Sequence, residues 1–282
     1  MTLSIIIVNF QNPPLLRLAL TSLARVVHSS LSCEVIVVDS SSTIETRNVV
    51  LHDTKDLFEG LVLLPYVENT GYTRGVNEGL RRATGEYILI LNPDIIVLPG
   101  TIEGLIAYLQ SHPAVGLVGP QLLNFDDTHQ ESSFRFYTPL TVLARRIPIP
   151  FTKALINRFL MRDLSLSTPW PVDWLMGSAL MTTRSALEQV GFMDERFFLY
   201  FSEVDWAHRF WEYGYGVVYI PTVQMYHYHQ RQSKGRFGIF DIFLQQQTRW
   251  HLKDAFSYFQ KHGRKGDRPQ KSHPLQPSLL TS

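Results

Sequence analysis

The chain has 282 residues, of which 45% are hydrophobic and 18% are charged, and its formal net charge is +1. This composition supports a large buried core and excludes a globally disordered protein. A net charge so close to zero argues against a dedicated nucleic-acid-binding protein, whose surface is usually strongly basic. No apolar run approaches the roughly 18 residues of a membrane span. The N-terminus lacks the basic region of a signal peptide, and a single cysteine, Cys33, fits a reducing compartment, so we expect a cytoplasmic protein.

Short runs rich in Val and Ile alternate with helix-length segments over the first part of the chain. Such runs predict strands that are buried on both faces of a parallel sheet. The alternation itself is typical of an open α/β sheet with right-handed crossovers. The predicted strands are Leu3–Phe10, Cys33–Asp39, Leu61–Val67, Glu86–Leu91 and Val115–Val118, and the predicted helices are Pro14–Val27, Ser42–Leu51, Tyr72–Ala83 and Thr101–Gln110.

The pattern is less regular after about residue 120. Residues 1–120 are therefore predicted to form a nucleotide-binding half, and residues 121–260 a substrate-shaping half of the same domain. The segment 261–282 is rich in Pro, Ser, Lys and Gln and is predicted to be a disordered tail. Within the second half, the predicted strands are Gln130–Tyr137, Ser178–Thr182, Val217–Ile220 and Val223–Tyr228, and the predicted helices are Val204–Glu212 and Ile239–Tyr258.

Two acidic residues follow predicted strands of the first half. In open α/β sheets, ligands bind beyond the carboxyl ends of the strands. Asp39 is placed to accept hydrogen bonds from a base or a ribose, although Asp is also a favoured helix N-cap residue. Asp94 follows Asn92-Pro93 and is suited to a hard divalent cation that bridges two phosphates, although the same residues are typical of a β-turn.

The segment Asn69–Gly79, just after the third predicted strand, contains three glycines. Glycines at a helix start allow a phosphate or a sugar to approach the backbone closely, and the helix N-terminus favours anions. The spacing matches neither a dinucleotide-binding fingerprint nor a P-loop. A plain structural explanation, in which the glycines serve a turn and the packing of a helix, remains open.

Two carboxylates, Glu203 and Asp205, follow an aromatic run from Phe197 to Phe201. An acid held beside aromatic surface can have a raised pKa, which suits a general base near neutral pH. The alternative is a helix start in which Ser202 is the N-cap and the two acids lie in the first turn.

Histidines alternate at His227 and His229, which places both on one face of a strand. That arrangement suggests a metal ligand or a phosphate contact. Packed or surface histidines are the structural alternative.

The order of these motifs is more specific than any one of them. VNF, VVDSSS, NTGYTRGVNEG, LNPD and VDWLMGSALMTTRSALEQVGFMDERFFLYFSEVDWAHR together resemble family 2 glycosyltransferases of the GT-A fold, in the rhamnosyltransferase-like branch. The resemblance extends from about residue 2 to about residue 235. It implies an α/β, Rossmann-like mixed but mostly parallel sheet flanked by helices, with an acceptor-binding C-terminal half.

The resemblance also implies roles for individual positions and a cofactor, Mg²⁺ or Mn²⁺. Asn92 stands where the family has the first acid of its metal motif, which leaves Asp94 as the main carboxylate on the ion. His227 is the expected metal-ligating histidine, with His229 as the competing choice. The implied donor-binding residues are Val8, Phe10, Asp39, Asn69, Gly75, Asn77, Asn92 and Asp94, the acceptor-binding residues are Trp174 and Gly177, and the phosphate-binding residues are Arg231 and Ser233.

The family usually carries an acidic pair followed by a further acid two residues on. Here that stretch is Ser202-Glu203-Val204-Asp205, so Glu203 is the expected catalytic base and Asp205 a supporting acid. The expected reaction is inverting transfer of a sugar, with L-rhamnose from dTDP-rhamnose as the first choice. The expected acceptor is a hydroxyl of a saccharide or polyprenyl-linked saccharide in bacterial cell-surface polysaccharide synthesis.

Three alternatives compete with this prediction. Another UDP- or dTDP-sugar is a possible donor, and a sugar-nucleotide-binding module without catalysis is a possible function. An oxidoreductase is disfavoured because the turn after the first strand, Asn9–Pro13, has no glycine. Residues 132–162 contain six basic residues and no acid, so this segment is expected either to contact membrane peripherally, at the inner face, or to form helices with a solvated basic face.

Overall fold

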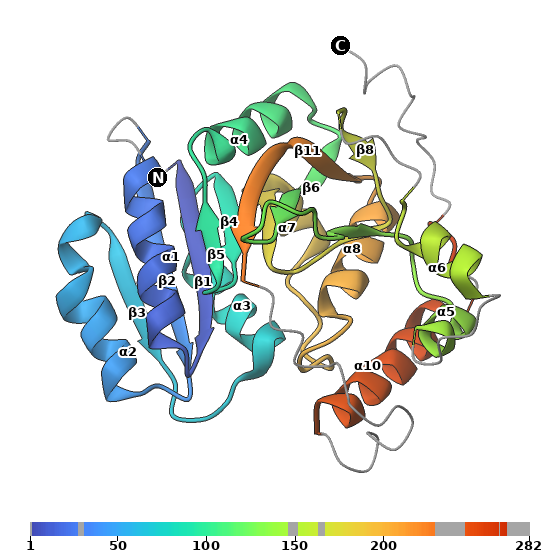
Figure 1. Ribbon diagram of the computed structural model, residues 1–282, viewed down its shortest axis with the longest axis horizontal. Helices are drawn as coiled ribbons and strands as arrows, with labels where there is room; N and C mark the ends of the chain where they lie inside the picture. The colour runs from blue at the N-terminus through green and yellow to red at the C-terminus, as the bar shows by residue number, and fades with distance from the viewer. Residues whose placement is uncertain are drawn as a thin grey trace.

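The computed structural model describes residues 2–27, 31–145, 152–162, 167–228, 246–264 and 266–269. Figure 1 shows a central twisted sheet with helices on both of its faces. Within the described residues, no helix is long and apolar enough to cross a membrane.

The first half of the chain forms the parallel part of the sheet, as the sequence predicts. Its strands β1, β2, β3 and β4 pair in the order β3-β2-β1-β4, with every neighbouring pair parallel. The elements are β1 Leu3–Phe10, α1 Pro13–Val26, β2 Cys33–Ser40, α2 Ile44–Asn48 with a π-helical turn Val49–Asp53 and a 3₁₀ turn Lys55–Leu57, β3 Leu61–Pro65, α3 Gly71–Arg82, β4 Tyr87–Leu91, β5 Ile95–Val97, α4 Thr101–Ser111 and β6 Val115–Leu123.

The remaining strands complete the sheet in mixed fashion, in the order β4-β10-β6-β11-β5, and β8 also pairs with β11. Strand β10 is antiparallel to both of its neighbours. The mixed, mostly parallel fold class is therefore confirmed. The remaining elements are β7 Ser133–Phe134, α5 Pro139–Ala144, α6 Lys153–Phe159, β8 Trp170–Pro171, β9 Trp174–Leu175, β10 Ala179–Thr183, α7 Arg184–Val190, α8 Ser202–Glu212, β11 Gly216–His227 and α10 Gln246–His262.

Some strands differ from the predicted elements. The predicted strands Val217–Ile220 and Val223–Tyr228 form a single strand, β11, whose register against β6 shifts between Ile220 and Gln224. Pro221 lies in this interval, and because proline has no backbone N–H it interrupts the ladder without ending the strand. The strand predicted over Gln130–Tyr137 is only the two-residue β7, and β5 was not predicted.

Alternate residues of β1 enter two different cores, one on each face of the sheet. Ile5 and Ile7 pack with α1 and α4, whereas Ile6 and Val8 pack with α3, α8 and α10. The core around Ile6 and Val8 therefore includes α8, the helix that carries Glu203 and Asp205.

The glycines of α3 are explained by close packing. A Cβ at Gly75 would lie 2.6 Å from Val8 Cγ1, and one at Gly79 would lie 2.3 Å from Ile6 Cγ2. At Gly71, where φ is +70°, a Cβ would lie 2.6 Å from the carbonyl oxygen of Phe198. The helix therefore seats directly on β1 and on the loop before α8. Close packing explains the glycines at these positions, and the expected donor-binding role of Gly75 stays a prediction.

The basic segment 132–162 spans α5 and α6, with residues 146–151 outside the described part. Some of its charges are engaged within the protein. Arg145 lies over the rings of Tyr137 and Phe159, and Arg162 pairs with Glu131 at 2.5 Å. The side of α5 away from the core nevertheless exposes large apolar side chains, with Leu140 60% and Leu143 53% exposed.

Helix α10 lies next to α8 in the C-terminal half (Figure 1). It extends to His262, inside the segment 261–282 that was predicted to be a disordered tail. Arg268 in the same segment donates to Asp173 Oδ1 at 2.5 Å and to the carbonyl of Pro171. Residues 270–282 lie outside the described residues, as do residues 239–245 of the predicted closing helix.

Candidate active site

The carboxyl end of β2 holds a buried acid with an unsatisfied oxygen. Asp39 is fully buried, and its Oδ1 accepts a 2.7 Å hydrogen bond from Asn9 Nδ2 at the end of β1. Asp39 Oδ2 has no hydrogen-bond partner among the described residues. A buried carboxylate oxygen without a donor is costly, so a hydrogen bond from a ligand would stabilise it. Phe10 lies 48% exposed at the end of β1, on the same sheet edge, while Val8 is buried against α3.

The segment after β3 lies against the same strand end. Ser40 Oγ accepts from the backbone N–H of Thr70 at 2.7 Å and donates to Asn69 Oδ1 at 3.3 Å. Asn69 Oδ1 also accepts from the N–H of Gly71, which fixes the start of α3. The predicted donor-binding residues Asp39 and Asn69 are thus brought together at one edge of the sheet.

Asn77 does not belong to this group. Its Nδ2 donates to the carbonyl of Met193 and to Glu195 Oε1, both at 2.9 Å, and its Oδ1 accepts from the N–H of Met193. Because both amide hydrogens are engaged, Asn77 holds α3 to the loop after α7. These contacts favour a structural role for Asn77, and its expected donor-binding role stays a prediction.

Asp94 and His227 face each other between the end of β4 and the end of β11. Asp94 Oδ1 lies 3.5 Å from His227 Nε2 and makes no hydrogen bond among the described residues, although it is buried. The opposite side of the imidazole is fixed by Gln130, whose Oε1 lies 2.9 Å from His227 Nδ1 and whose Nε2 donates to the His227 carbonyl at 2.9 Å. A proton on Nδ1 directs the lone pair of Nε2 toward Asp94.

These residues fit a divalent cation. A carboxylate oxygen and an imidazole nitrogen are suitable ligands, and two ligands of one octahedral ion lie about 3 Å apart. The amide of Gln130 orients the histidine in the manner of an outer-shell partner. Sequence reasoning missed Gln130, because only the pairing of β6 and β11 brings it to His227.

The turn between β9 and β10 links the Asp94 region to α3. The N–H of Asn92 donates to the carbonyl of Ser178, and Asn92 Nδ2 donates to Ser178 Oγ at 3.2 Å. The neighbouring Gly177 carbonyl accepts a 2.6 Å hydrogen bond from the hydroxyl of Tyr72 on α3. A Cβ at Gly177 would lie 2.9 Å from that hydroxyl, so a glycine is required for the approach.

Glu203 lies at the start of α8, close to Tyr72. Burial raises the pKa of both Tyr72 and Tyr137, and the negative charge of the nearby Glu203 adds to each shift. Burial raises the pKa of the Glu203 carboxyl itself to about 7, and the nearby Asp254 adds to this, whereas a hydrogen bond from Ser202 opposes it. A carboxyl group with this pKa can accept and release a proton near neutral pH.

The backbone that presents Glu203 is strained. Phe201, two residues earlier, has φ = 65°, a left-handed conformation that is rare for a bulky residue. Phe201 is held there by ring contacts with Tyr137 and Tyr258, and Asp254 accepts from the N–H groups of Leu199 and Tyr200. Strain of this kind persists only where the surroundings impose it, and it is common at functional sites.

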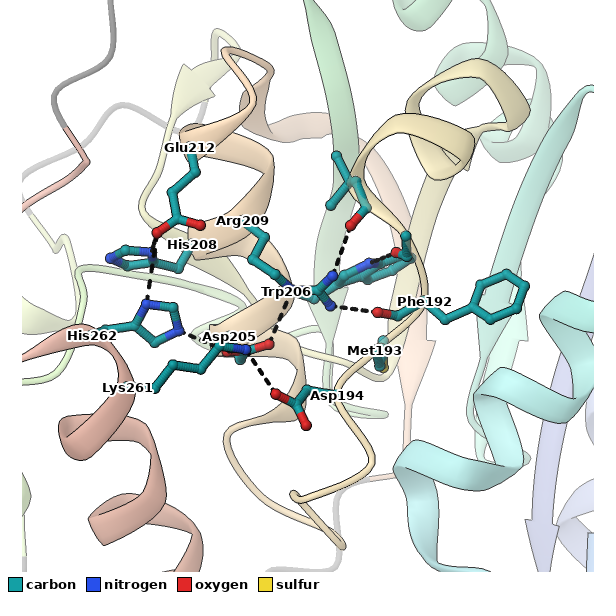
Figure 2. A network of polar contacts seen from close by, with 12 residues as sticks. Phe192, Met193, Asp194, Asp205, Trp206, His208, Arg209, Glu212, Lys261 and His262 are labelled. Carbon is teal, nitrogen blue, oxygen red and sulfur yellow. Dashed lines mark hydrogen bonds and ion pairs between the residues drawn. The ribbon is translucent and has the colours of Figure 1, made fainter.

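Asp205 lies in a different environment, shown in Figure 2. It is fully buried and contacts Arg209 at 3.2 Å, Lys261 at 2.6 Å and His262 at 2.7 Å. Burial alone would raise its pKa, but the hydrogen bonds from His262 and Lys261 lower it below its ordinary value. A carboxylate held between three bases is a poor proton acceptor. This geometry favours an ion-pair role that joins α8 to α10, and the expected role of Asp205 as a supporting acid of catalysis stays a prediction.

Trp174 was expected to line an acceptor site. Its side chain is only 5% exposed and stacks on Phe134, and its Nε1 donates to the carbonyl of Arg135. It therefore has little surface for a saccharide to contact in this structure, and its expected acceptor-binding role stays a prediction. The expected phosphate-binding residues Arg231 and Ser233, and the alternative metal ligand His229, lie outside the described residues.

Comparison with solved structures identifies the class of fold. Mannosyltransferase PcManGT from Pyrobaculum calidifontis, in complex with GDP-Man and Mn²⁺, matches with a TM-score of 0.61 and 20% identity, over 98% of this chain and 67% of that chain. TarS of S. aureus matches with a TM-score of 0.57 and 15% identity, over 80% of this chain but only 36% of its own length. The fold is that of the GT-A glycosyltransferases.

The family follows from sequence. The model described as "Glycosyl transferase family 2" matches residues 4–206, and the chain belongs to this family. It is also similar to the N-acetylglucosaminyl-diphospho-decaprenol L-rhamnosyltransferase of Mycobacterium tuberculosis, with 28% identity over 246 residues, which cover 83% of this chain and 78% of that protein. The chain is therefore a family 2 glycosyltransferase with a rhamnosyltransferase-like sequence.

Proposed function

We propose that the chain transfers a sugar with inversion from a nucleotide donor to a hydroxyl group, using Glu203 as the base and a divalent cation at Asp94 and His227. The observation that carries the proposal is the Glu203 carboxyl, whose pKa of about 7 suits proton abstraction. It neighbours Tyr72, whose hydroxyl binds Gly177 beside the β9–β10 turn that holds Asn92. These contacts connect Glu203 to the edge of the sheet where Asp94 follows β4.

The reaction is a single displacement. The acceptor hydroxyl gives its proton to Glu203, and its oxygen forms the new bond to the anomeric carbon. The bond from that carbon to the diphosphate breaks, and the nucleoside diphosphate departs with the electron pair. Asp39 and Asn69 hold the nucleoside end of the donor. A cation bound by Asp94 and His227 would neutralise charge that develops on the diphosphate.

We propose dTDP-L-rhamnose as the donor and a polyprenyl-linked saccharide as the acceptor, in cell-surface polysaccharide synthesis. The support is the similarity to the mycobacterial rhamnosyltransferase, whose name describes a decaprenol-linked acceptor. Other dTDP- or UDP-sugars are the alternative donors, and the cation is Mg²⁺ or Mn²⁺.

Nucleotide binding tests the donor and the cation together. With Mn²⁺, dTDP at a hundred times its Kd should stabilise the wild-type protein by about 2.7 kcal/mol, because it binds only the folded state. UDP at the same concentration should produce a smaller shift in Tm. In Asp94→Asn, the part of the shift that depends on Mn²⁺ should be lost. The measurement is a thermal-shift titration with and without Mn²⁺.

The matched control is Asp56→Asn, which removes the same charge from an exposed position of the 3₁₀ turn and should retain the full shift. Equal responses to dTDP and UDP would contradict the rhamnose donor. An unchanged Mn²⁺ response in Asp94→Asn would contradict the cation site.

We also propose peripheral contact with membrane through α5, in keeping with a lipid-linked acceptor. Leu140 and Leu143 are more than half exposed on this helix, beside the basic segment. The double variant Leu140→Ser/Leu143→Ser should bind vesicles containing anionic lipid about tenfold more weakly than the wild type, since it removes apolar area available for insertion. Vesicle flotation measures this.

Two controls accompany the flotation assay. Leu57→Ser alters an exposed leucine on the 3₁₀ turn and should bind as the wild type does. A chain truncated after Gly263 removes the basic tail as a source of binding. Retention of full binding by the double variant, or absence of binding by the wild type, would reject this contact.

A further inference from the structure

A second cluster of metal-ligating side chains lies where α8 meets the end of α10 (Figure 2). His208 and Glu212 are one turn apart on α8, and His262 is the last residue of α10. One ligand atom from each of the three residues can be chosen so that all lie within 4.8 Å of one another. None of the three residues belongs to the elements that carry Asp94 and His227.

The distances approach those of a metal site. His208 Nδ1 lies 3.3 Å from Glu212 Oε1, and His262 Nδ1 lies 3.9 Å from the same oxygen. Ligands about 2.0–2.1 Å from a tetrahedral zinc ion are about 3.3 Å apart. Because the Glu212 side chain is 40% exposed, its carboxylate has room to adjust toward His262.

His208 provides independent support for a ligand. The residue is only 8% exposed, and its Nδ1 makes no hydrogen bond among the described residues. A buried imidazole nitrogen that has no hydrogen-bond partner in the described part of the protein is available to bind a metal ion.

The second histidine is oriented by a carboxylate. His262 Nε2 lies 2.7 Å from Asp205 Oδ1, so a proton on Nε2 is shared with Asp205 and the lone pair of Nδ1 is directed toward Glu212. A carboxylate behind a metal-binding histidine is a recurrent outer-shell arrangement. It also gives the buried Asp205 a function beyond its ion pairs.

We propose that His208, Glu212 and His262 bind a zinc-class divalent cation that joins α10 to α8. Two imidazoles and one carboxylate are a donor set typical of zinc, whereas magnesium prefers oxygen ligands. Solvent reaches the cluster past Glu212, so water can complete the coordination. Because Asp254 of α10 binds the backbone before Glu203, a cation here also steadies the loop that presents the base.

Cobalt and zinc binding test this site without any nucleotide or sugar. The full-length chain is stripped with a chelator in an Asp94→Asn background, which separates the proposed site from the one at Asp94. Titration with Co²⁺ should give the intense visible absorption of a tetrahedral site, and Zn²⁺ should displace it. Glu212→Gln should weaken Zn²⁺ binding tenfold or more, and zinc should no longer raise the Tm of this variant.

The matched control is Glu188→Gln, which makes the same change at an exposed position of α7. Since Glu212 is partly exposed, its variant should fold, which circular dichroism verifies. Equal Zn²⁺ affinity in the Glu212→Gln and Glu188→Gln proteins would overturn the proposal, as would the weak spectrum of octahedral cobalt. Either outcome leaves the proposed glycosyltransferase activity unaffected, because no transfer is measured.

Discussion

Glu203→Gln should lower sugar transfer by about two to four orders of magnitude, the usual contribution of a general base. The glutamine is nearly isosteric but cannot accept a proton, so binding of the nucleotide should be unchanged. In the wild type, kcat/KM should rise with pH through about 7, because the Glu203 carboxyl must be ionised to act. Initial rates with dTDP-rhamnose and a polyprenyl-linked acceptor, measured over a range of pH, test both statements.

The same substitution should stabilise the fold at alkaline pH. A carboxyl whose pKa rises from 4.5 to about 7 on folding favours the folded state when protonated, and this advantage is lost as pH rises through about 7. At pH 8, Glu203→Gln should therefore be more stable by on the order of 2 kcal/mol, and near pH 4 it should equal the wild type. If the Glu203→Gln protein transferred sugar at a rate within tenfold of the wild type, Glu203 would be excluded as the base.

Asp205→Asn should reduce the free energy of unfolding by about 3–5 kcal/mol, since removing one partner of a buried ion pair leaves the others uncompensated. Asp205 is fully buried against Arg209, Lys261 and His262. Because its folded pKa is below the ordinary value of 3.8, the stabilisation is present above that pH and is lost as pH falls through the lowered pKa. Urea denaturation at neutral pH measures the difference.

A surface ion pair provides the control for this prediction. Asp53 pairs with Arg17 where both side chains are well exposed, 39% and 58% respectively. Asp53→Asn should therefore change stability by no more than about 1 kcal/mol. If Asp205→Asn proved as mild as Asp53→Asn but abolished transfer, Asp205 rather than Glu203 would be the base.

The parallel half of the fold was predictable because its signals are local. A strand such as Leu3–Phe10, apolar on both faces, can be stable only inside a covered sheet. The antiparallel β10 and the short β5 were not predictable in the same way, since their positions depend on partners far away in the sequence. Local pattern also cannot show that a strand continues past a proline, as β11 does at Pro221.

The sequence predicted which acids belong to the candidate site, but it could not predict how their environments differ. Glu203 and Asp205 are both acids at a helix start, and sequence alone left their environments unspecified. The geometry separates them, because α10 brings Lys261 and His262 to Asp205 and the acid Asp254 near Glu203. For the same reason, the glycines of α3 were open to two explanations until the contacts of Gly75 and Gly79 with β1 were visible.

Asp254, which binds the backbone before Glu203, belongs to the helix that is made last among the described elements. During synthesis the N-terminal strands, with the proposed nucleoside-binding residues, leave the ribosome before α10. The loop before Glu203 can acquire the contacts from Asp254 only after α10 has emerged. If Glu203 is the base, as proposed, competence for transfer therefore comes only with completion of the fold.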